Sequence, residues 1–510
     1  MKLEGRSFIG YTRGKGSDAI PGAGRNPRTG EFLEPSCIAA TPEEVESACA
    51  MAASAFPVFS SLPGRERALF LRRIASNIES LADEIDARMT METGLPAGRA
   101  QGERGRTCAQ LRMFADVIDE SSWVDARIDT AQPDRKPLPK PDLRSMWRPL
   151  GPVAVFCAGN FPLAFSVAGG DTASALAAGN PVIVNAHIAH PGVAELVGGA
   201  VAGAARDCGM PEGVFSLVYG NGFATGQALV RHPSIRAVGF TGSQRGGRAL
   251  MEIAASRPVP IPVYAEMSSV NPVIILPGAA GERGDAIAEA LHGAINLGAG
   301  QFCTAPGLIL APGDSALIAA LTRRCVETPA AVMLNEGIAR AYAAGVERLR
   351  THPEVQTLAE GAEDTSIFAP ARAALFATTS AALLADPVLQ AEVFGPCALI
   401  VRYDALDELT AILTTLAGQL TVTVQAAEAD LGTVQGLMEQ LAQLAGRVIV
   451  NGVPTGVEVC DGMVHGGPFP ATSDGRTTSV GPRSILRFCR EVCYQNVPDA
   501  LLPAVLRQEN

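Results

Sequence analysis

The sequence predicts an α/β protein with two doubly wound domains, each a mostly parallel sheet covered by helices. Short strands that alternate with helix-length segments are typical of such sheets. The chain has 510 residues, too many for a single core, which favours two or three domains. The strands are expected in two sets of apolar runs, first at 152–157, 181–185, 214–219, 235–240 and 261–265, then, beyond residue 270, in V-I-I-L, L-I-L-A, A-L-I-V, L-T-V-T-V and R-V-I-V-N.

Composition and charge exclude several classes of protein. Hydrophobic residues make up 47% of the chain and charged residues 18%, as in soluble globular proteins. The net charge of −11 is diffuse, which disfavours nucleic acid as a partner. The amino terminus does not resemble a signal peptide, and no apolar run predicts a membrane span. The 11 cysteines contain no C-x-x-C pair, so we expect a cytoplasmic protein without a metal site.

The first 150 residues are read as packing elements. T-P-E-E at 41–44 combines an N-cap threonine, a proline at the first helical position and a glutamate three residues after the cap, which predicts a helix to about residue 56. A second helix is expected over 64–90, where apolar residues recur at helical spacing. From 125 to 147, four prolines lie among charges, and these residues alone indicate a flexible linker.

Polar residues follow the expected strands of the first sheet. Asn160, Asn185 and Glu266 lie at or just beyond strand ends, and ligands of doubly wound sheets bind outside the carboxyl ends of the strands. There is no G-x-G-x-x-G fingerprint. In F-T-G-S-Q-R-G-G, however, Gly242 and Ser243 open a helix whose free N–H groups attract a pyrophosphate. A tight strand-to-helix turn without a ligand is the alternative.

One cysteine stands in a sequence context suited to catalysis. Cys303 lies in N-L-G-A-G-Q-F-C-T-A-P-G-L at 296–308, where glycines and a proline predict an accessible loop. Free cysteines are more often buried hydrophobes, so position alone does not make it a nucleophile. Glu266 ends a buried strand, where desolvation is expected to raise its pKa to suit a general base. The side-chain amide of Asn160 and the backbone N–H of Cys303 are candidate donors to an oxyanion.

Five short motifs occur along the chain, in the order N-F-P at 160–162, F-T-G-S at 240–243, A-E-M-S-S at 265–269, G-Q-F-C-T at 300–304 and E-V-F-G-P at 392–396. Their order and spacing resemble those of the NAD(P)-dependent aldehyde dehydrogenases, and the resemblance covers nearly the whole chain. Within that family, residues 162–179 and 464–476 are most similar to the α-ketoglutaric semialdehyde (2,5-dioxovalerate) dehydrogenases.

The resemblance implies an aldehyde dehydrogenase-like fold with a small β arm for oligomerisation. It implies a homodimer or homotetramer, in which Trp147 lies near the foot of the arm. The expected division is a dinucleotide-binding domain at 1–124 and 148–266, a catalytic domain at 267–470, and an arm and tail at 125–147 and 471–510.

The resemblance also implies the chemistry. Cys303 attacks an aldehyde, Asn160 stabilises the oxyanion, hydride passes to NAD or NADP, and Glu266 activates the water that hydrolyses the thioester. Glu392 contacts the nicotinamide ribose, and Phe394 lies against the ring. The expected cofactor-binding residues are Phe161, Asn185, Ile188, Phe240, Thr241, Gly242, Ser243, Met267, Glu392 and Phe394.

Departures from the family pattern concern mainly the cofactor. Asn185 replaces a lysine that grips a phosphate, and Ile188 replaces a glutamate that repels one. We therefore expect both NAD and NADP to be accepted. Ala305 replaces an asparagine, with smaller consequences.

Other functions remain open at this point. A cysteine hydrolase would pair Cys303 with a histidine, for which His292 and His465 are candidates. A non-catalytic derivative of the fold and an NADP-type fatty aldehyde dehydrogenase are further alternatives. A substrate with a distal carboxylate needs a cation, and Arg104, Arg106 and Arg112 are candidates by position.

Overall fold

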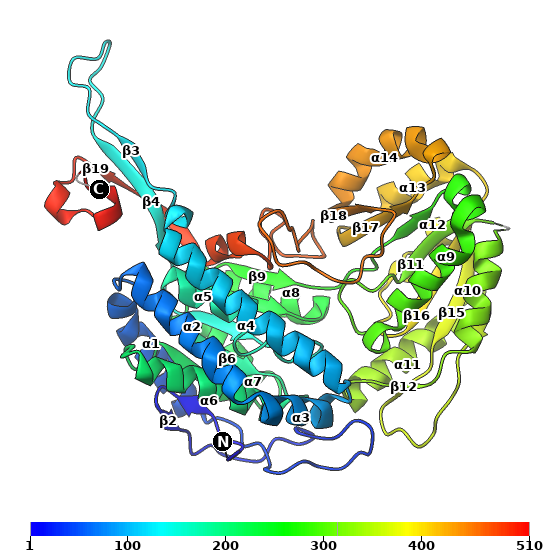
Figure 1. The fold of residues 1–510 in the computed structure, drawn as a ribbon, viewed down its shortest axis with the longest axis horizontal. Coiled ribbons are helices and arrows are strands. Elements are labelled where there is room, and N and C mark those ends of the chain that lie inside the picture. The colour runs from blue at the N-terminus through cyan, green and yellow to red at the C-terminus, as the bar shows by residue number, and fades with distance from the viewer. Residues whose placement is uncertain (1, 314, 509–510) are drawn as a thin grey trace.

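The computed structural model describes residues 2–313 and 315–508. Two α/β lobes lie side by side, and a narrow β arm projects from the first (Figure 1). The predicted fold class is confirmed, because each lobe contains a mostly parallel sheet with helices on both faces.

The sheet of the first lobe has seven strands in the order β2-β1-β7-β6-β5-β8-β9. Strands β5 to β9 pair in parallel, and β1 adds an antiparallel edge. The order reverses between β5 and β8, and this is where doubly wound sheets bind ligands. All five strands predicted for this sheet are confirmed to within two residues. The strands are β1 Phe8–Ile9, β2 Thr12–Arg13, β5 Val153–Phe156, β6 Val182–Ala186, β7 Phe215–Tyr219, β8 Ala237–Thr241 and β9 Val263–Glu266.

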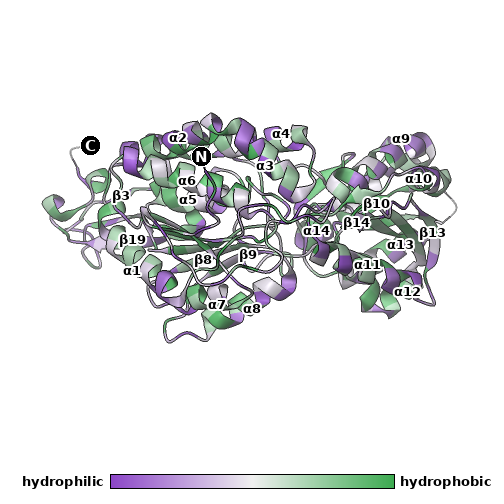
Figure 2. Cartoon of the chain, turned by 90° about the horizontal axis from the view of Figure 1, so that it is seen from below, coloured by the Kyte–Doolittle hydropathy of each residue, from purple (hydrophilic) through white to green (hydrophobic). Residues whose placement is uncertain are grey.

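Alternate residues of the strands serve two separate cores. In β5, Val153 and Val155 pack on one face with α2 to α6, whereas Ala154 and Phe156 pack on the other with α1, α7 and α8. Figure 2 shows these strands as largely hydrophobic, while many helices carry hydrophilic residues. The helices are α1 Pro42–Phe59, α2 Gly64–Ser80, α3 Ala82–Thr93, α4 Ala97–Glu120, α5 Gly170–Ala178, α6 Pro191–Asp207, α7 Ala224–Arg231 and α8 Gln244–Ala255.

Of two predictions about the early helices, one is confirmed and one is wrong. The capping box of α1 is confirmed, because Thr41 accepts from the N–H of Glu44 and the Glu44 carboxylate accepts from the N–H of Thr41. The single helix predicted over 64–90 is wrong. Leu81, at φ −106° and ψ 21°, leaves the helical conformation and separates α2 from α3. The apolar spacing continues through that break, so the pattern alone did not reveal it.

The second lobe has its own seven-stranded sheet, in the order β13-β15-β16-β11-β10-β17-β18. The five predicted strands are confirmed, but two were missed: the edge strand β13, which is mostly polar, and β15, in which alanine and threonine flank Leu375 and Phe376. The strands are β10 Val273–Ile275, β11 Leu308–Pro312, β13 Gln356–Glu360, β15 Ala374–Thr379, β16 Cys397–Tyr403, β17 Gln419–Gln425 and β18 Ala445–Val450. The helices are α9 Pro277–Asn296, α10 Ala316–Val326, α11 Glu336–Arg350, α12 Ser380–Ala385, α13 Leu406–Thr415 and α14 Leu431–Leu444.

The arm is a three-stranded antiparallel sheet, so the reading of 125–147 as a flexible linker is wrong. Its strands are β3 Arg127–Asp129, β4 Leu143–Pro149 and β19 Cys489–Gln495, in the order β19-β4-β3. The carboxyl-terminal strand β19 pairs with β4 along its whole length, which ties the tail to the arm. Within the described residues, no helix is both long and apolar enough to cross a membrane.

The remaining elements are short. A two-stranded pair, β12 Ala331–Val332 with β14 Pro370–Ala371, lies outside the main sheets. The 3₁₀ helices are η1 Ser122–Val124, η2 Leu297–Gly300, η3 Pro387–Gln390, η4 Glu428–Asp430, η5 Pro482–Phe488, η6 Asp499–Leu501 and η7 Ala504–Leu506.

Candidate active site

A large cavity lies where the carboxyl ends of the first sheet face the second lobe. Its volume is about 430 Å³, in the range of small-molecule sites. Strands β8 and β9 and the loop after β5 contribute from the first lobe, whereas the Cys303 loop, α11 and the 392–394 segment contribute from the second. Its lining residues are Gly159, Asn160, His187, Thr241, Gly242, Ser243, Glu266, Met267, Ser268, Cys303, Ile338, Ala341, Tyr342, Gly345, Arg348, Glu392, Val393 and Phe394.

Cys303 is held on a tight loop between η2 and β11. Gly298, Ala299 and Gly300 all have left-handed backbone conformations, with φ of +57°, +58° and +67°. A Cβ on Gly300 would lie 2.2 Å from the carbonyl carbon of Gly395, so the cysteine loop packs directly against the E-V-F-G-P segment. The close approach brings Cys303 and Glu392 to the same cavity.

Asn271 holds the loop that carries Cys303 in place, a role that the sequence analysis missed. Its Nδ2 donates to the carbonyl oxygens of both Cys303 and Ala305, each at 2.9 Å. The Gln419 side-chain oxygen in turn accepts from the backbone N–H of Asn271 at 3.1 Å. Both side chains are buried, so this network positions the cysteine backbone. Asn271 lies five residues after Glu266, but nothing in its neighbouring sequence indicates that it contacts a loop more than 30 residues away.

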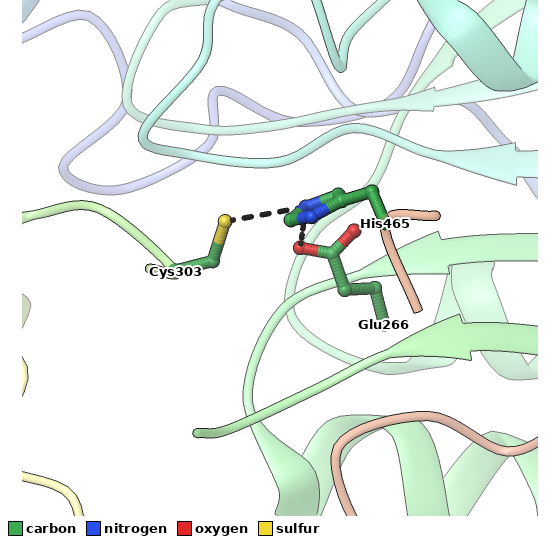
Figure 3. A group of neighbouring side chains, drawn as sticks. All are labelled: Glu266, Cys303 and His465. Atoms are coloured by element: carbon green, nitrogen blue, oxygen red, sulfur yellow. Dashed lines mark hydrogen bonds and ion pairs between the residues drawn. The ribbon is translucent and has the colours of Figure 1, made fainter. Parts of the chain in front are cut away.

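Glu266, Cys303 and His465 meet at one point (Figure 3). The Nε2 of His465 lies 3.0 Å from the Oε1 of Glu266 and 3.5 Å from the Sγ of Cys303. Ser479 donates to the other Glu266 oxygen at 2.9 Å. Potential ligand atoms of the three residues all lie within 4.8 Å of one another. The structure thus brings together the predicted nucleophile and base, and adds a histidine that the sequence offered only as a hydrolase partner.

The expected rise in the pKa of Glu266 is wrong. Burial does raise this pKa, but the charge and hydrogen bond of His465, with hydrogen bonds from Cys303 and Ser479, outweigh burial and lower the pKa below its ordinary value. The pKa of the Cys303 thiol is raised well above its ordinary range by desolvation and by the neighbouring Glu266. The resting pair is therefore a thiol beside an ionised carboxylate.

The geometry assigns a donor role to His465. The same nitrogen, Nε2, faces both the Glu266 carboxylate and the Cys303 sulfur, and an ionised carboxylate only accepts hydrogen bonds. Nε2 must therefore carry a proton, so it is unavailable to accept the thiol proton. Glu266 is the acceptor within reach, whereas His465 stabilises negative charge on the carboxylate or the sulfur.

Candidate oxyanion donors surround the sulfur. Asn160 Nδ2 donates one hydrogen to the carbonyl oxygen of Gln301 at 3.0 Å, which leaves its second N–H for a ligand. The backbone N–H of Cys303 contacts its own sulfur. Buried Glu103 accepts from the N–H groups of Leu163 and Ala164, at 2.9 and 3.0 Å, and so anchors the loop that carries Asn160.

The predicted cofactor residues divide into two groups. Thr241, Gly242, Ser243, Met267, Glu392 and Phe394 line the cavity, whereas Phe161, Asn185, Ile188 and Phe240 are not among its lining residues. Phe161 instead packs edge-on against Phe302, with ring centroids 5.3 Å apart. Phe240 supports the turn below Gly242, where an added Cβ would lie 2.7 Å from its ring. Ile188 is 43% exposed at the surface.

The residues present fit a dinucleotide. Ser243 caps α8, because its Oγ accepts from the N–H of Gly246 at 3.2 Å, and Ser243 lines the cavity, so the amino terminus of this helix lies at the cavity wall. The Oδ1 of Asn185 is buried without a hydrogen-bond partner, an unusual state that a ribose hydroxyl would relieve. Arg348 of α11 adds a cation suited to phosphate, which the sequence analysis missed.

His187 also lines the cavity, two residues after the missing lysine, but it does not replace that charge. Burial, and then neighbouring His190, lower the pKa of His187 to about 3, so the ring is neutral. Its Nδ1 accepts from the N–H of Ala189 at 3.2 Å, which leaves the proton on Nε2.

Glu392 is an unusual carboxyl group. Burial raises its pKa to about 7, while hydrogen bonds from Ser268 and Ser269 lower it. It therefore changes charge near neutral pH.

A parallel sheet that ends at a helix amino terminus, together with a cysteine beside a carboxylate, is the arrangement expected of an enzyme that binds a dinucleotide. The comparisons with known proteins specify this class further. Residues 23–468 match the model of the aldehyde dehydrogenase family, and the chain belongs to that family. It is an NAD(P)-dependent enzyme that oxidises an aldehyde, neither a cysteine hydrolase nor a non-catalytic derivative.

Two relatives match almost end to end. Alpha-ketoglutaric semialdehyde dehydrogenase 2 of Azospirillum brasilense is 51% identical, covering 100% of this chain and 98% of its own. Alpha-ketoglutaric semialdehyde dehydrogenase of Acinetobacter baylyi is 47% identical, covering 92% and 90%. The crystal structure of a gamma-glutamyl-gamma-aminobutyraldehyde dehydrogenase from Burkholderia cenocepacia J2315 superposes with a TM-score of 0.83 at 23% identity, over 97% of both chains.

Proposed function

We propose that the enzyme oxidises α-ketoglutaric semialdehyde to 2-oxoglutarate, with Cys303 as the nucleophile. The substrate assignment is supported by the two relatives of that activity at 51% and 47% identity. The observation that carries the catalytic assignment is the convergence of Glu266 and His465 on the Cys303 sulfur, at the edge of the dinucleotide-sized cavity.

The reaction begins with transfer of the Cys303 proton to Glu266. The sulfur then forms a bond to the aldehyde carbon, and the carbonyl oxygen becomes an oxyanion that accepts from Asn160 Nδ2 and from the N–H of Cys303. Bound NAD(P) supplies the acceptor for the hydride that leaves this carbon as the thioester forms. Glu266 releases its first proton to solvent and then takes a proton from water, whose oxygen bonds to the thioester carbon. The C–S bond breaks, the acid leaves, and the Cys303 sulfur recovers a proton from Glu266.

The cofactor is held along the large cavity. Thr241, Gly242 and Ser243 would place the amino terminus of α8 beside the pyrophosphate, and Asn185 would lie near the adenosine ribose. Glu392 would hold the nicotinamide ribose, with Phe394 and Met267 near the ring. Phe161 and Phe240 act indirectly, by packing under the residues that line the cavity, and Ile188 leaves room for a 2′-phosphate.

The domain division follows the two sheets. The dinucleotide-binding domain comprises 1–124 and 148–266, the catalytic domain 267–470, and the arm and tail 125–147 and 471–510.

The arm exposes large apolar side chains, including Ile128 at 44% and Leu138 at 70%, as expected of a surface that meets a second copy in a homodimer or homotetramer. Light scattering of Ile128→Glu tests this, and an unchanged mass would contradict it. All 11 cysteines are free, as in proteins of the reducing cytoplasm.

Initial rates across an aldehyde panel, with NAD and with NADP, test the function. We expect kcat/KM to be highest for α-ketoglutaric semialdehyde and both cofactors to be accepted. Values for medium-chain aliphatic aldehydes that equal or exceed it would make an NADP-type fatty aldehyde dehydrogenase the better description. The matched control, Cys303→Ala, should bind dinucleotide without turnover, and a residual rate above about a tenth would refute the nucleophile.

A further inference from the structure

Three arginines of helix α4 have different electrostatic partners. Arg104 directs Nε and Nη2, one edge of its guanidinium, to the two oxygens of Asp86, each at 3.0 Å. Arg112 binds both oxygens of Glu79, at 2.7 and 2.6 Å. Both arginines are therefore neutralised by carboxylates of the protein itself.

In Arg106 the corresponding edge of the guanidinium, Nε and Nη2, has no partner among the described residues. Its Nη1 donates to the carbonyl oxygen of Val457, but its Nε and Nη2 are buried and make no hydrogen bond to any described residue. Across residues 2–313 and 315–508, this guanidinium also forms no ion pair within 4.0 Å. These two atoms form the planar fork that matches a carboxylate, and Arg104 shows the same edge occupied by one.

A second arginine contacts the same loop from β18, an edge strand of the second sheet. Arg447, on β18, donates to the carbonyl oxygens of Pro454 and Gly456, next to the Val457 carbonyl that holds Arg106. Its Nε is also buried and unpartnered. The two guanidinium groups, both half-buried, thus converge on residues 454–457, and three of their nitrogen atoms are buried without a hydrogen-bond partner. Buried polar groups are costly to leave unpaired, so such an arrangement indicates a site for an anion.

Helix α4 passes beside the catalytic loop, because Arg99, seven residues before Arg106, lies over the ring of Phe302 at 4.7 Å and donates to the carbonyl oxygen of Asn160. Burial lowers the pKa of both Arg106 and Arg447. The charges of Glu103, Glu458 and Cys303 raise the pKa of Arg106, and Cys303 raises that of Arg447. Neither arginine lines the large cavity assigned to the dinucleotide. The subsite that they would form is therefore separate from the cavity assigned to the dinucleotide.

We propose that Arg106 and Arg447 form the subsite for a carboxylate at the far end of the substrate. The free edge of Arg106 binds both oxygens, and Arg447 adds a donor from the second lobe. The subsite rests on the proposed function, because α-ketoglutaric semialdehyde carries its carboxylate at the end opposite the aldehyde. It also distinguishes Arg106 from Arg104 and Arg112, which the sequence alone did not rank as candidates for binding the carboxylate.

The test compares kcat/KM for α-ketoglutaric semialdehyde with kcat/KM for pentanal, a neutral aldehyde of equal carbon number. The ratio cancels losses common to both substrates. We expect Arg106→Gln and Arg447→Gln each to lower it at least about tenfold, the size of one charged hydrogen bond. Arg106→Lys, which keeps the charge without the fork, should lose less. The matched control, Arg104→Gln, should keep the ratio within about twofold.

The outcomes separate the subsite from the proposed function. The wild-type ratio tests the function, because a value at or below one removes the semialdehyde assignment. The subsite is tested by how much each substitution lowers this ratio. The same substitutions should also lower the ratio of kcat/KM for succinic semialdehyde to that for butanal. An unchanged ratio in Arg106→Gln, with wild-type melting behaviour, overturns the subsite even if the enzyme prefers the semialdehyde. An equal loss in Arg104→Gln overturns it as well, because the effect would then reflect general helix charge. If Arg106→Gln does not fold, Arg447→Gln decides by the same criterion.

Discussion

The Nε2 atom of His465 lies 3.0 Å from the Oε1 atom of Glu266, although 199 positions separate them in the chain. This contact helps to keep the carboxylate ionised in a buried site, because the interaction with His465, together with hydrogen bonds from Cys303 and Ser479, outweighs the cost of desolvation. The proposed base is thus ready to accept a proton over a wider pH range than burial alone would allow.

Replacement of His465 by Phe should therefore shift the pH dependence of turnover. Without the donor, burial raises the pKa of Glu266, so the base is ionised only at higher pH. We expect the acidic limb of the kcat profile to move upward by about one pH unit, equivalent to roughly tenfold lower activity on that limb. His465→Gln retains an N–H donor and should move the limb less. An acidic limb that stays in place in both variants would show that another group controls it.

Replacement of Glu266 by Gln should separate the two halves of the reaction. Loss of a general base typically slows a step by about 10²–10⁴-fold, so thioester hydrolysis should limit turnover and acyl-enzyme should accumulate. Mass spectrometry of a quenched reaction would detect the adduct on Cys303. Because Glu266 is also the proposed acceptor of the thiol proton, a slow variant with neither adduct nor hydride burst would place its main role before acylation.

The stability of the ligand-free protein should depend on Glu392. Burial raises its pKa to about 7, above the ordinary value of 4.5, so its neutral form stabilises the fold at acidic pH. That contribution is complete below the unfolded pKa and is lost as pH rises through about 7. Glu392→Gln stays neutral, so it should match the wild type at pH 5 and melt about 2 °C higher at pH 8. The effect is small because Glu392 is only half-buried and water screens the charge.

Thermal melting of the ligand-free protein between pH 5 and pH 8 measures this difference. The exposed Glu282 provides the control, and Glu282→Gln should melt in parallel with the wild type across the range. A Glu392→Gln variant that is equally shifted at both pH values would contradict the assignment.

Cofactor selectivity should respond to residue 185. His187 is neutral, with a pKa lowered to about 3 by burial, so the lysine absent at Asn185 is not replaced by a cation there. Asn185→Lys should tighten NADP relative to NAD by about tenfold or more, since a charged hydrogen bond contributes about 1.5–3 kcal/mol. Dissociation constants for both dinucleotides measure the ratio, with Asn185→Gln as the uncharged control. If the ratio is the same in all three proteins, the phosphate is held elsewhere, for which Arg348 is the first candidate.

The sequence alone determined much of the fold. Ten strands were predicted because apolar β-branched runs of strand length are local signals that tertiary context seldom overrides. The same approach missed the mostly polar edge strand β13, the alanine- and threonine-rich strand β15, and the break at Leu81. The five motifs were recognisable because the chemistry requires particular residues at fixed positions along the chain.

Tertiary structure decided what those residues do together. The pKa of Glu266 falls rather than rises because His465, far along the chain, packs against it. Arg104, Arg106 and Arg112 look alike in sequence, yet only Arg106 reaches the loop at 454–457 with an edge free. Desolvation and charge pairing depend on which segments meet in space, whereas strand and helix signals lie within a few neighbouring residues. The sequence therefore determined the elements and the reactive groups, and long-range packing determined their protonation states and partners.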